Sequence, residues 1–111
     1  MDTSQLLRGV LPTVVLAAVA SGDSHGYSIL RGLREAGLEQ VGDASVYGAL
    51  QRLYGDGLVS THLEPSERGP ARRCYTLTPA GQGALIEGAQ AWASFKGAID
   101  HLVQARSGER Q

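Results

Sequence analysis

The C-terminal third of the chain constrains the fold most strongly, because it predicts one long helix. Thr78 is a suitable N-cap, and Pro79 follows at the first helical position, where its missing N–H costs nothing. No further proline occurs before Arg106. The helix should therefore span about 28 residues, or about 40 Å at 1.5 Å per residue. Such a helix is long for a chain of 111 residues.

One face of this predicted helix carries large apolar residues at alternating spacings of three and four, which is typical of a helix that packs against another helix. The large residues are Leu85, Trp92, Phe95, Ile99 and Leu102, and Gly88 occupies the remaining position of the series. The rest of the chain is too small to cover this face as well as its own core. We therefore expect a second copy of the same helix to cover it, which makes the chain a homodimer.

Two shorter helices are expected in the first part of the chain. Residues 6–20 are apolar, with Pro12 either in the first turn of the helix or at a kink. Asp23 or Ser24 can cap the second helix, and Gly37 can end it. The first run also has the length of a signal-peptide core, so a secreted chain cut after residue 20 is a weaker alternative.

A third helix is expected from Asp43, whose carboxylate suits a helix N-terminus, to the glycines that follow residue 54. Its inner stripe consists of Val46, Leu50 and Leu53. This spacing determines which side of the helix is exposed. Three helices in close succession favour a helix-turn-helix core.

The sequence then changes from helical to strand-like periodicity. The runs "LVSTHL" and "RRCYTL" are typical of strands, and "EPSERGPA" between them is rich in turn formers, so a β-hairpin with a long tip is predicted. The fold class is therefore mainly α with one hairpin (α+β), a winged helix-turn-helix followed by a long dimerisation helix. We expect a DNA-binding domain over 1–77, a dimerisation helix over 78–106 and a disordered tail over 107–111.

Composition excludes several classes of protein. The net charge is −1, so nucleic-acid binding has to depend on how the charges are distributed. Cys74 is the single cysteine, which excludes an internal disulfide and favours a cytoplasmic location. The three histidines share no ligand spacing with one another or with Cys74, and no catalytic pair or phosphate-binding loop is present. We expect no enzyme activity, metal or other cofactor, and no membrane association.

The exposed side of the third helix suits DNA. In a helix-turn-helix motif the second helix lies in the major groove, and the outward residues here are Ser45, Tyr47, Gln51 and Arg52. A glutamine side chain can read adenine, and an arginine side chain can read guanine. Serine and tyrosine hydroxyls can form hydrogen bonds to phosphate. The hairpin adds basic residues near its tip, which are suited to phosphates or the minor groove. They are Arg68, Arg72 and Arg73, and Tyr27 of the second helix is a further candidate for DNA contact.

These segments together resemble the PadR family of transcriptional regulators, in particular its short class with a single C-terminal helix. The resemblance is carried by "LLRG" at 6–9, "HGYSI" at 25–29, "SVYGALQRLYGDGLV" at 45–59 and "RRCYTLTPAG" at 72–81. It implies a homodimeric repressor that binds a pseudo-palindromic operator, with a recognition helix over 45–54 and a wing over 58–77. Trp92 is similar in position to a dimer-interface tryptophan that, in some members, stacks flat aromatic compounds and thereby releases DNA.

Two alternatives remain open at this point. A winged helix without specific DNA binding can serve as a protein-interaction module, and the near-neutral charge is compatible with that reading. In the C-terminal helix, Trp92 and Phe95 either line a site for a small aromatic or hydrophobic effector or only pack the dimer.

Overall fold

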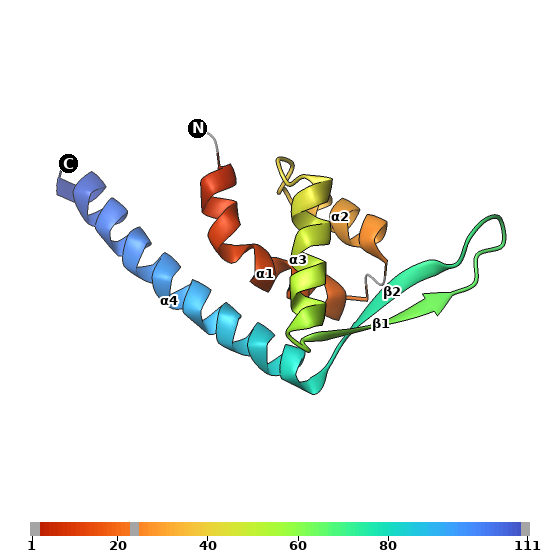
Figure 1. Cartoon of the computed structure of the whole chain (residues 1–111). Helices are drawn as coiled ribbons and strands as arrows, with labels where there is room; N and C mark the ends of the chain where they lie inside the picture. Colours follow the sequence, from red (N-terminus) through yellow and green to blue (C-terminus); the bar gives the residue numbers. More distant parts are fainter. Residues whose placement is uncertain (1–2, 23–24, 110–111) are drawn as a thin grey trace.

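The computed structural model describes residues 3–22 and 25–109, with side chains as far as residue 105. Figure 1 shows three helices gathered above a β-hairpin, with a fourth, long helix leaving the base of the hairpin. The elements in chain order are α1 (Ser4–Ala20), α2 (Gly26–Glu35), α3 (Asp43–Gly55), β1 (Val59–Glu64), β2 (Arg72–Leu77) and α4 (Pro79–Glu109). This order of three helices, hairpin and long helix confirms the predicted α+β winged helix-turn-helix.

The core lies where α1, α2 and α3 meet the base of the hairpin. The most deeply buried side chains come from all of these elements: Val15, Ile29, Val46, Leu50, Val59 and Cys74. The inner stripe of α3 is confirmed, since Val46 and Leu50 have no exposed surface and Leu53 only 4%. Cys74 of β2 is also fully buried, and its thiol donates to the carbonyl of Arg72.

Pro12 lies well inside α1, which begins at Ser4 and continues to Ala20. Of the two expectations for this proline, the structure therefore supports an interior position in a longer helix. A proline there removes one hydrogen bond of the helix and crowds the carbonyl group four residues before it. No helix that the structure describes is both long and apolar enough to cross a membrane.

The ends of the helices follow the expected chemistry with one correction. His25, rather than Asp23 or Ser24, caps α2: its Nδ1 accepts the N–H of Ser28 at 3.3 Å, and the Ser28 hydroxyl faces the His25 backbone N–H in return. Asp23 and Ser24 lie outside the described residues. Gly37 ends α2 with a φ of +113°, a conformation that side chains other than glycine rarely adopt.

The start of α4 is tied to the base of the hairpin. The Thr78 hydroxyl accepts the N–H of Gly81 at 3.0 Å and donates to the carbonyl of Gly57 at 2.7 Å, so the predicted N-cap is confirmed. Gly81 has no room for a side chain, because a Cβ would collide with the carbonyl oxygen of Leu58. The direction in which α4 leaves the wing is therefore fixed by close backbone packing.

The hairpin forms a two-stranded antiparallel sheet in which Val59 pairs with Leu77 and Glu64 with Arg72. The free edge of β2 forms an additional bridge from Cys74 to His25. On one face, the Glu64 carboxylate accepts hydrogen bonds from the His62 ring and the Cys74 thiol. These hydrogen bonds hold the pKa of Glu64 below the usual range.

Helix α4 packs along α1 and then extends beyond the core, which gives the molecule dimensions of 61 × 28 × 19 Å. It is longer than predicted: residues 107–109, which we expected in a disordered tail, belong to the helix, and 110–111 lie outside the described residues. Among the predicted interface residues, Leu85 packs partly against the core. Those that follow are exposed: Trp92 by 44%, Phe95 by 61%, Ile99 by 43% and Leu102 by 69%.

Candidate nucleic-acid interface

A concave surface of about 750 Å³ lies between the N-terminal end of α2, α3 and strand β2. We call it the arginine cleft, and it is lined by His25, Gly26, Tyr27, Arg31, Tyr47, Arg72, Arg73 and Tyr75. Three of these residues are arginines and none carries a carboxylate. The cleft is therefore electropositive, although the chain as a whole has a net charge of −1.

Helix α2 contributes a stacked pair to the cleft. The Arg31 guanidinium carbon lies 5.8 Å from the centre of the Tyr27 ring, a cation–π distance. Tyr27 is 62% exposed, so the pair lies at the surface and not in the core. The sequence analysis included Tyr27 but missed Arg31. The spacing of four residues along one helix, which places both on the same face, was a signal that was available.

Strand β2 contributes two adjacent arginines and a tyrosine. Neither Arg72 nor Arg73 forms an ion pair with a carboxylate of the described residues. Tyr75 shares a face of the strand with Arg73, because side chains two residues apart point the same way. Burial raises the pKa of the Tyr75 hydroxyl while the charge of Arg73 lowers it by a smaller amount, so the hydroxyl stays protonated as a hydrogen-bond donor.

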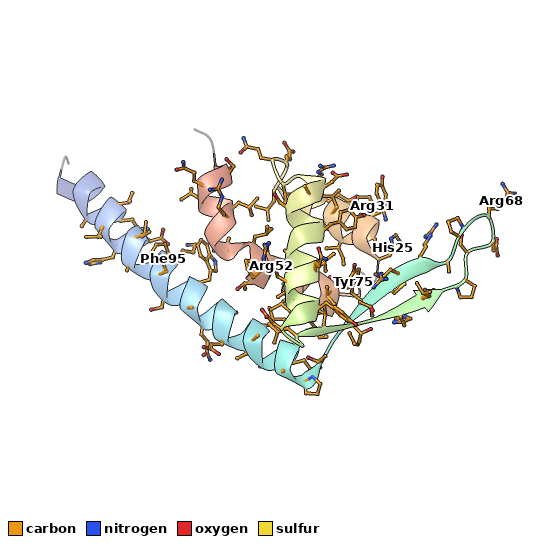
Figure 2. All side chains as sticks on the ribbon, in the orientation of Figure 1. His25, Arg31, Arg52, Arg68, Tyr75 and Phe95 are labelled. Atoms are coloured by element: carbon orange, nitrogen blue, oxygen red, sulfur yellow. The ribbon has the colours of Figure 1, made fainter. Side chains whose placement is uncertain are left out.

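His25 joins the two sides of the cleft. Its Nδ1 caps α2, and its Nε2 lies 3.4 Å from Nη1 of Arg72. His25 thus has a structural role at the start of α2 and also lines the cleft. Figure 2 shows His25 at the end of α2 beside the hairpin, close to the start of β2.

Helix α3 places only Tyr47 in the cleft. The Tyr47 ring lies against Gly26, where any Cβ would collide with it, so glycine at this position lets the two helices approach. Tyr47 remains 45% exposed despite this contact. The glycine therefore sets the position of an aromatic ring at the wall of the cleft.

The other predicted contacts on α3 are exposed but lie outside the cleft: Ser45, Gln51 and Arg52. The Arg52 guanidinium passes over Gly48, whose Cβ position is 3.6 Å from Nη1 of Arg52. Figure 2 shows Arg52 on the side of α3 away from the hairpin, and Arg68 at the far tip of the wing. The predicted residues thus divide into a cleft group, a second exposed surface on α3 and the wing tip.

The comparisons with known proteins agree with this architecture. The sequence profile of the transcriptional regulator PadR-like family matches residues 15–87. An uncharacterised protein of Lysinibacillus sphaericus is 28% identical over 94% of this chain and 97% of its own length. A transcriptional regulator of Mycobacterium tuberculosis is 35% identical over 72% of this chain and 73% of its own length.

Solved structures extend the likeness to the fold. A PadR-like transcriptional regulator from Bacillus cereus has a TM-score of 0.81 and 31% identity, covering 91% of this chain and 98% of that chain. Bacillus subtilis PadR, solved in complex with operator DNA, has a TM-score of 0.64 and 22% identity, covering 70% of this chain and 45% of that chain. The last likeness concerns the fold alone. With the profile match over most of the chain, these findings show that the protein belongs to the PadR-like family of transcriptional regulators.

Proposed function

We propose that this regulator binds double-stranded operator DNA as a homodimer and represses transcription. The arginine cleft would hold the phosphate backbone while the exposed side of α3 reads bases. The observation that carries the proposal is the arrangement of donors around His25 and Arg72. Family membership supports it, as does the fold shared with Bacillus subtilis PadR, whose structure contains operator DNA.

The hydrogen-bond donors around His25 and Arg72 favour the binding of an anion. Because Nδ1 of His25 accepts the Ser28 N–H, a neutral ring carries its proton on Nε2. Nη1 of Arg72, 3.4 Å away, is also a donor, so these two groups cannot satisfy each other. A phosphate oxygen placed between them would accept from both. Arg31, Arg73 and the Tyr75 hydroxyl supply further donors in the same cleft.

The exposed residues of α3 fit the complementary role. Phosphate contacts position a protein on the duplex but carry no base information. Three exposed residues of α3 lie outside the cleft and have side chains that can read base edges: Ser45, Gln51 and Arg52. Arg68, at the wing tip, suits phosphates or the adjacent minor groove. This division assigns affinity to the cleft and the wing, and discrimination to α3.

Dimerisation would follow from the apolar residues on α4. Six large apolar side chains beyond Leu85 are at least 43% exposed in one chain: Ile86, Trp92, Phe95, Ile99, Leu102 and Val103. A second copy would cover them, and its two-fold symmetry would match a pseudo-palindromic operator. Trp92, at the centre of this surface, would then also be available to an aromatic effector that alters the spacing of the two DNA-binding domains.

Titration of the protein with a labelled fragment from upstream of its own gene tests the DNA-binding proposal. Anisotropy would be measured at about 50 mM and about 200 mM salt, with a scrambled fragment of the same length as the control. We expect tighter binding to the upstream fragment and a steep loss of affinity at the higher salt. Equal binding to both fragments would exclude specific recognition of that region.

A second function is favoured by one observation, the net charge of −1 with a single arginine on α3. A winged helix of this kind can bind a protein partner instead. The variant carrying Arg72→Glu and Arg73→Glu separates the two functions. Loss of DNA binding in this variant supports the regulator. Absence of DNA binding in the unmodified chain, together with a protein partner that the variant retains, supports the interaction module.

A further inference from the structure

A second cluster of chemically active side chains lies on the hairpin, apart from the arginine cleft. His62 and Cys74 are direct partners in the antiparallel register, so their side chains occupy the same face of the sheet. Glu64 follows His62 by two residues and therefore shares that face. One ligand atom from each, an imidazole nitrogen, a carboxylate oxygen and the thiol sulfur, all lie within 4.8 Å of one another.

This set of donors has the composition of a zinc site. Zinc takes nitrogen, sulfur and oxygen ligands in tetrahedral geometry, and bond lengths of about 2.0–2.1 Å place neighbouring nitrogen and oxygen ligands about 3.3 Å apart. Nε2 of His62 lies 3.2 Å from Oε1 of Glu64, close to that separation. The sulfur is near enough that a small rotation of side chains would complete three corners of a tetrahedron.

The surroundings leave one side open. The Cys74 side chain is fully buried, whereas the side chains of His62 and Glu64 are 50% and 56% exposed. A cation would therefore enter from the solvent side of His62 and Glu64, with the sulfur beneath it and the outward corner free for water. Three protein ligands and one open position are an arrangement that zinc accepts.

We propose that His62, Glu64 and Cys74 form a binding site for a thiophilic divalent cation of the zinc class, with water as the fourth ligand. The thiol proton would be released to solvent on binding, since the thiolate is the ligand. The bound ion would link β1 to β2 in the half of the hairpin nearer its tip. Sequence spacing did not predict this site, because the ligands are brought together by strand pairing across the loop and not by neighbouring positions.

Cobalt(II), which has a spectrum that zinc lacks, is a suitable probe. It would be added to the full-length, tag-free chain under reducing conditions after removal of metals with a chelator. We expect one cobalt per chain, with a sulfur-to-metal charge-transfer band and visible bands of tetrahedral strength. Zinc should displace the cobalt and abolish both. Heating the zinc-loaded chain should give a higher melting temperature than heating the metal-free chain.

Three variants distinguish specific cobalt binding at this site from nonspecific binding elsewhere on the chain. His62→Gln changes an exposed side chain and should fold normally, yet lose at least about 100-fold in cobalt affinity, since even residues behind metal ligands contribute 10- to 100-fold. Cys74→Ser should abolish the charge-transfer band. His101→Gln, on an exposed part of α4, is the matched control and should bind as the unmodified chain does.

Three results would overturn the proposal: no charge-transfer band in the unmodified chain, a band that persists unchanged in His62→Gln, or one cobalt shared by two chains through their cysteines. Each of these can be observed without any DNA. The proposal therefore stands or falls separately from the proposed function.

Discussion

Two exposed surfaces of the molecule differ in almost every physical property. The arginine cleft is concave and positively charged, and within the described residues neither Arg72 nor Arg73 of its lining pairs with a carboxylate. The exposed part of α4 is apolar, and its large side chains include Trp92, Phe95, Ile99, Leu102 and Val103. A surface of the first kind attracts an anion, whereas one of the second kind is covered by another apolar surface. Salt should therefore weaken the first interaction much more than the second.

The core explains why these surfaces remain separate. Helices α1, α2 and α3 bury their own large residues with the base of the hairpin, so the DNA-binding part of the chain is largely complete without α4 beyond Leu85. In the C-terminal half of α4, by contrast, the large apolar side chains as far as residue 105 remain exposed. Family membership assigns the chain to the transcriptional regulators. Under the proposed function, the cleft would meet DNA and the exposed part of α4 would meet a second protomer.

Trp92→Glu should have the largest effect, because it places a charge at the centre of the apolar surface of α4. We expect the dimer dissociation constant to rise by at least about 100-fold, measured by sedimentation equilibrium, since an unpaired buried charge is strongly unfavourable. DNA affinity should fall by about 10²- to 10⁴-fold as the second copy is lost. Gln90→Glu adds the same charge two positions away, on the opposite face of the helix, and should leave the dimer intact. Equal dissociation by both variants would contradict the assignment of the interface.

Gly81→Ala tests the joint between the two regions. A Cβ at this position collides with the backbone carbonyl of Leu58, so α4 or the base of the wing has to move. We expect a loss of about 1–3 kcal/mol in the free energy of unfolding, measured by urea denaturation. Gly83→Ala, two residues further along, meets no atom within 4 Å and should stabilise the helix by up to about 1 kcal/mol. Stabilisation by both alanines would show that the joint is not tightly packed.

Gln51→Ala tests whether α3 discriminates between DNA sequences while the cleft provides affinity for phosphate. Removing a base-reading side chain should reduce the preference for the operator by about 1–3 kcal/mol while binding to unrelated DNA changes little. Competition between operator and scrambled fragments measures this preference directly. A uniform loss on every DNA sequence would mean that Gln51 contacts phosphate, and that the reading face of α3 is assigned wrongly.

Periodicity and caps were sufficient to predict the elements of the fold. The spacing of Val46, Leu50 and Leu53 determined the buried side of α3, and Thr78 with Pro79 located the start of α4. The cap at His25 was missed, because histidine is less common in that role than the aspartate and serine that precede it. The end of α4 was placed too early, because Ser107 and Gly108 are typical of a helix end, yet the helix continues through both to Glu109.

The candidate site could be predicted only in part. Tyr27, Tyr47, Arg72 and Arg73 were identified from the types and positions of the residues, but their meeting in one cleft depends on how α2 packs beside β2. That packing includes a bridge between His25 and Cys74, which are far apart in the sequence, and no local pattern encodes it. The same applies to His62, Glu64 and Cys74, whose proximity arises from the register of the hairpin.

The most direct test of the central claim is the salt dependence of operator binding by Arg72→Gln, compared with the unmodified chain and with Arg8→Gln, an exposed arginine of α1 outside the cleft. Each lost phosphate contact should reduce the slope of log affinity against log salt by about 0.9, or about 1.8 for a dimer. We predict that reduction for Arg72→Gln and an unchanged slope for Arg8→Gln. An unchanged slope for Arg72→Gln would show that the arginine cleft does not hold the DNA backbone.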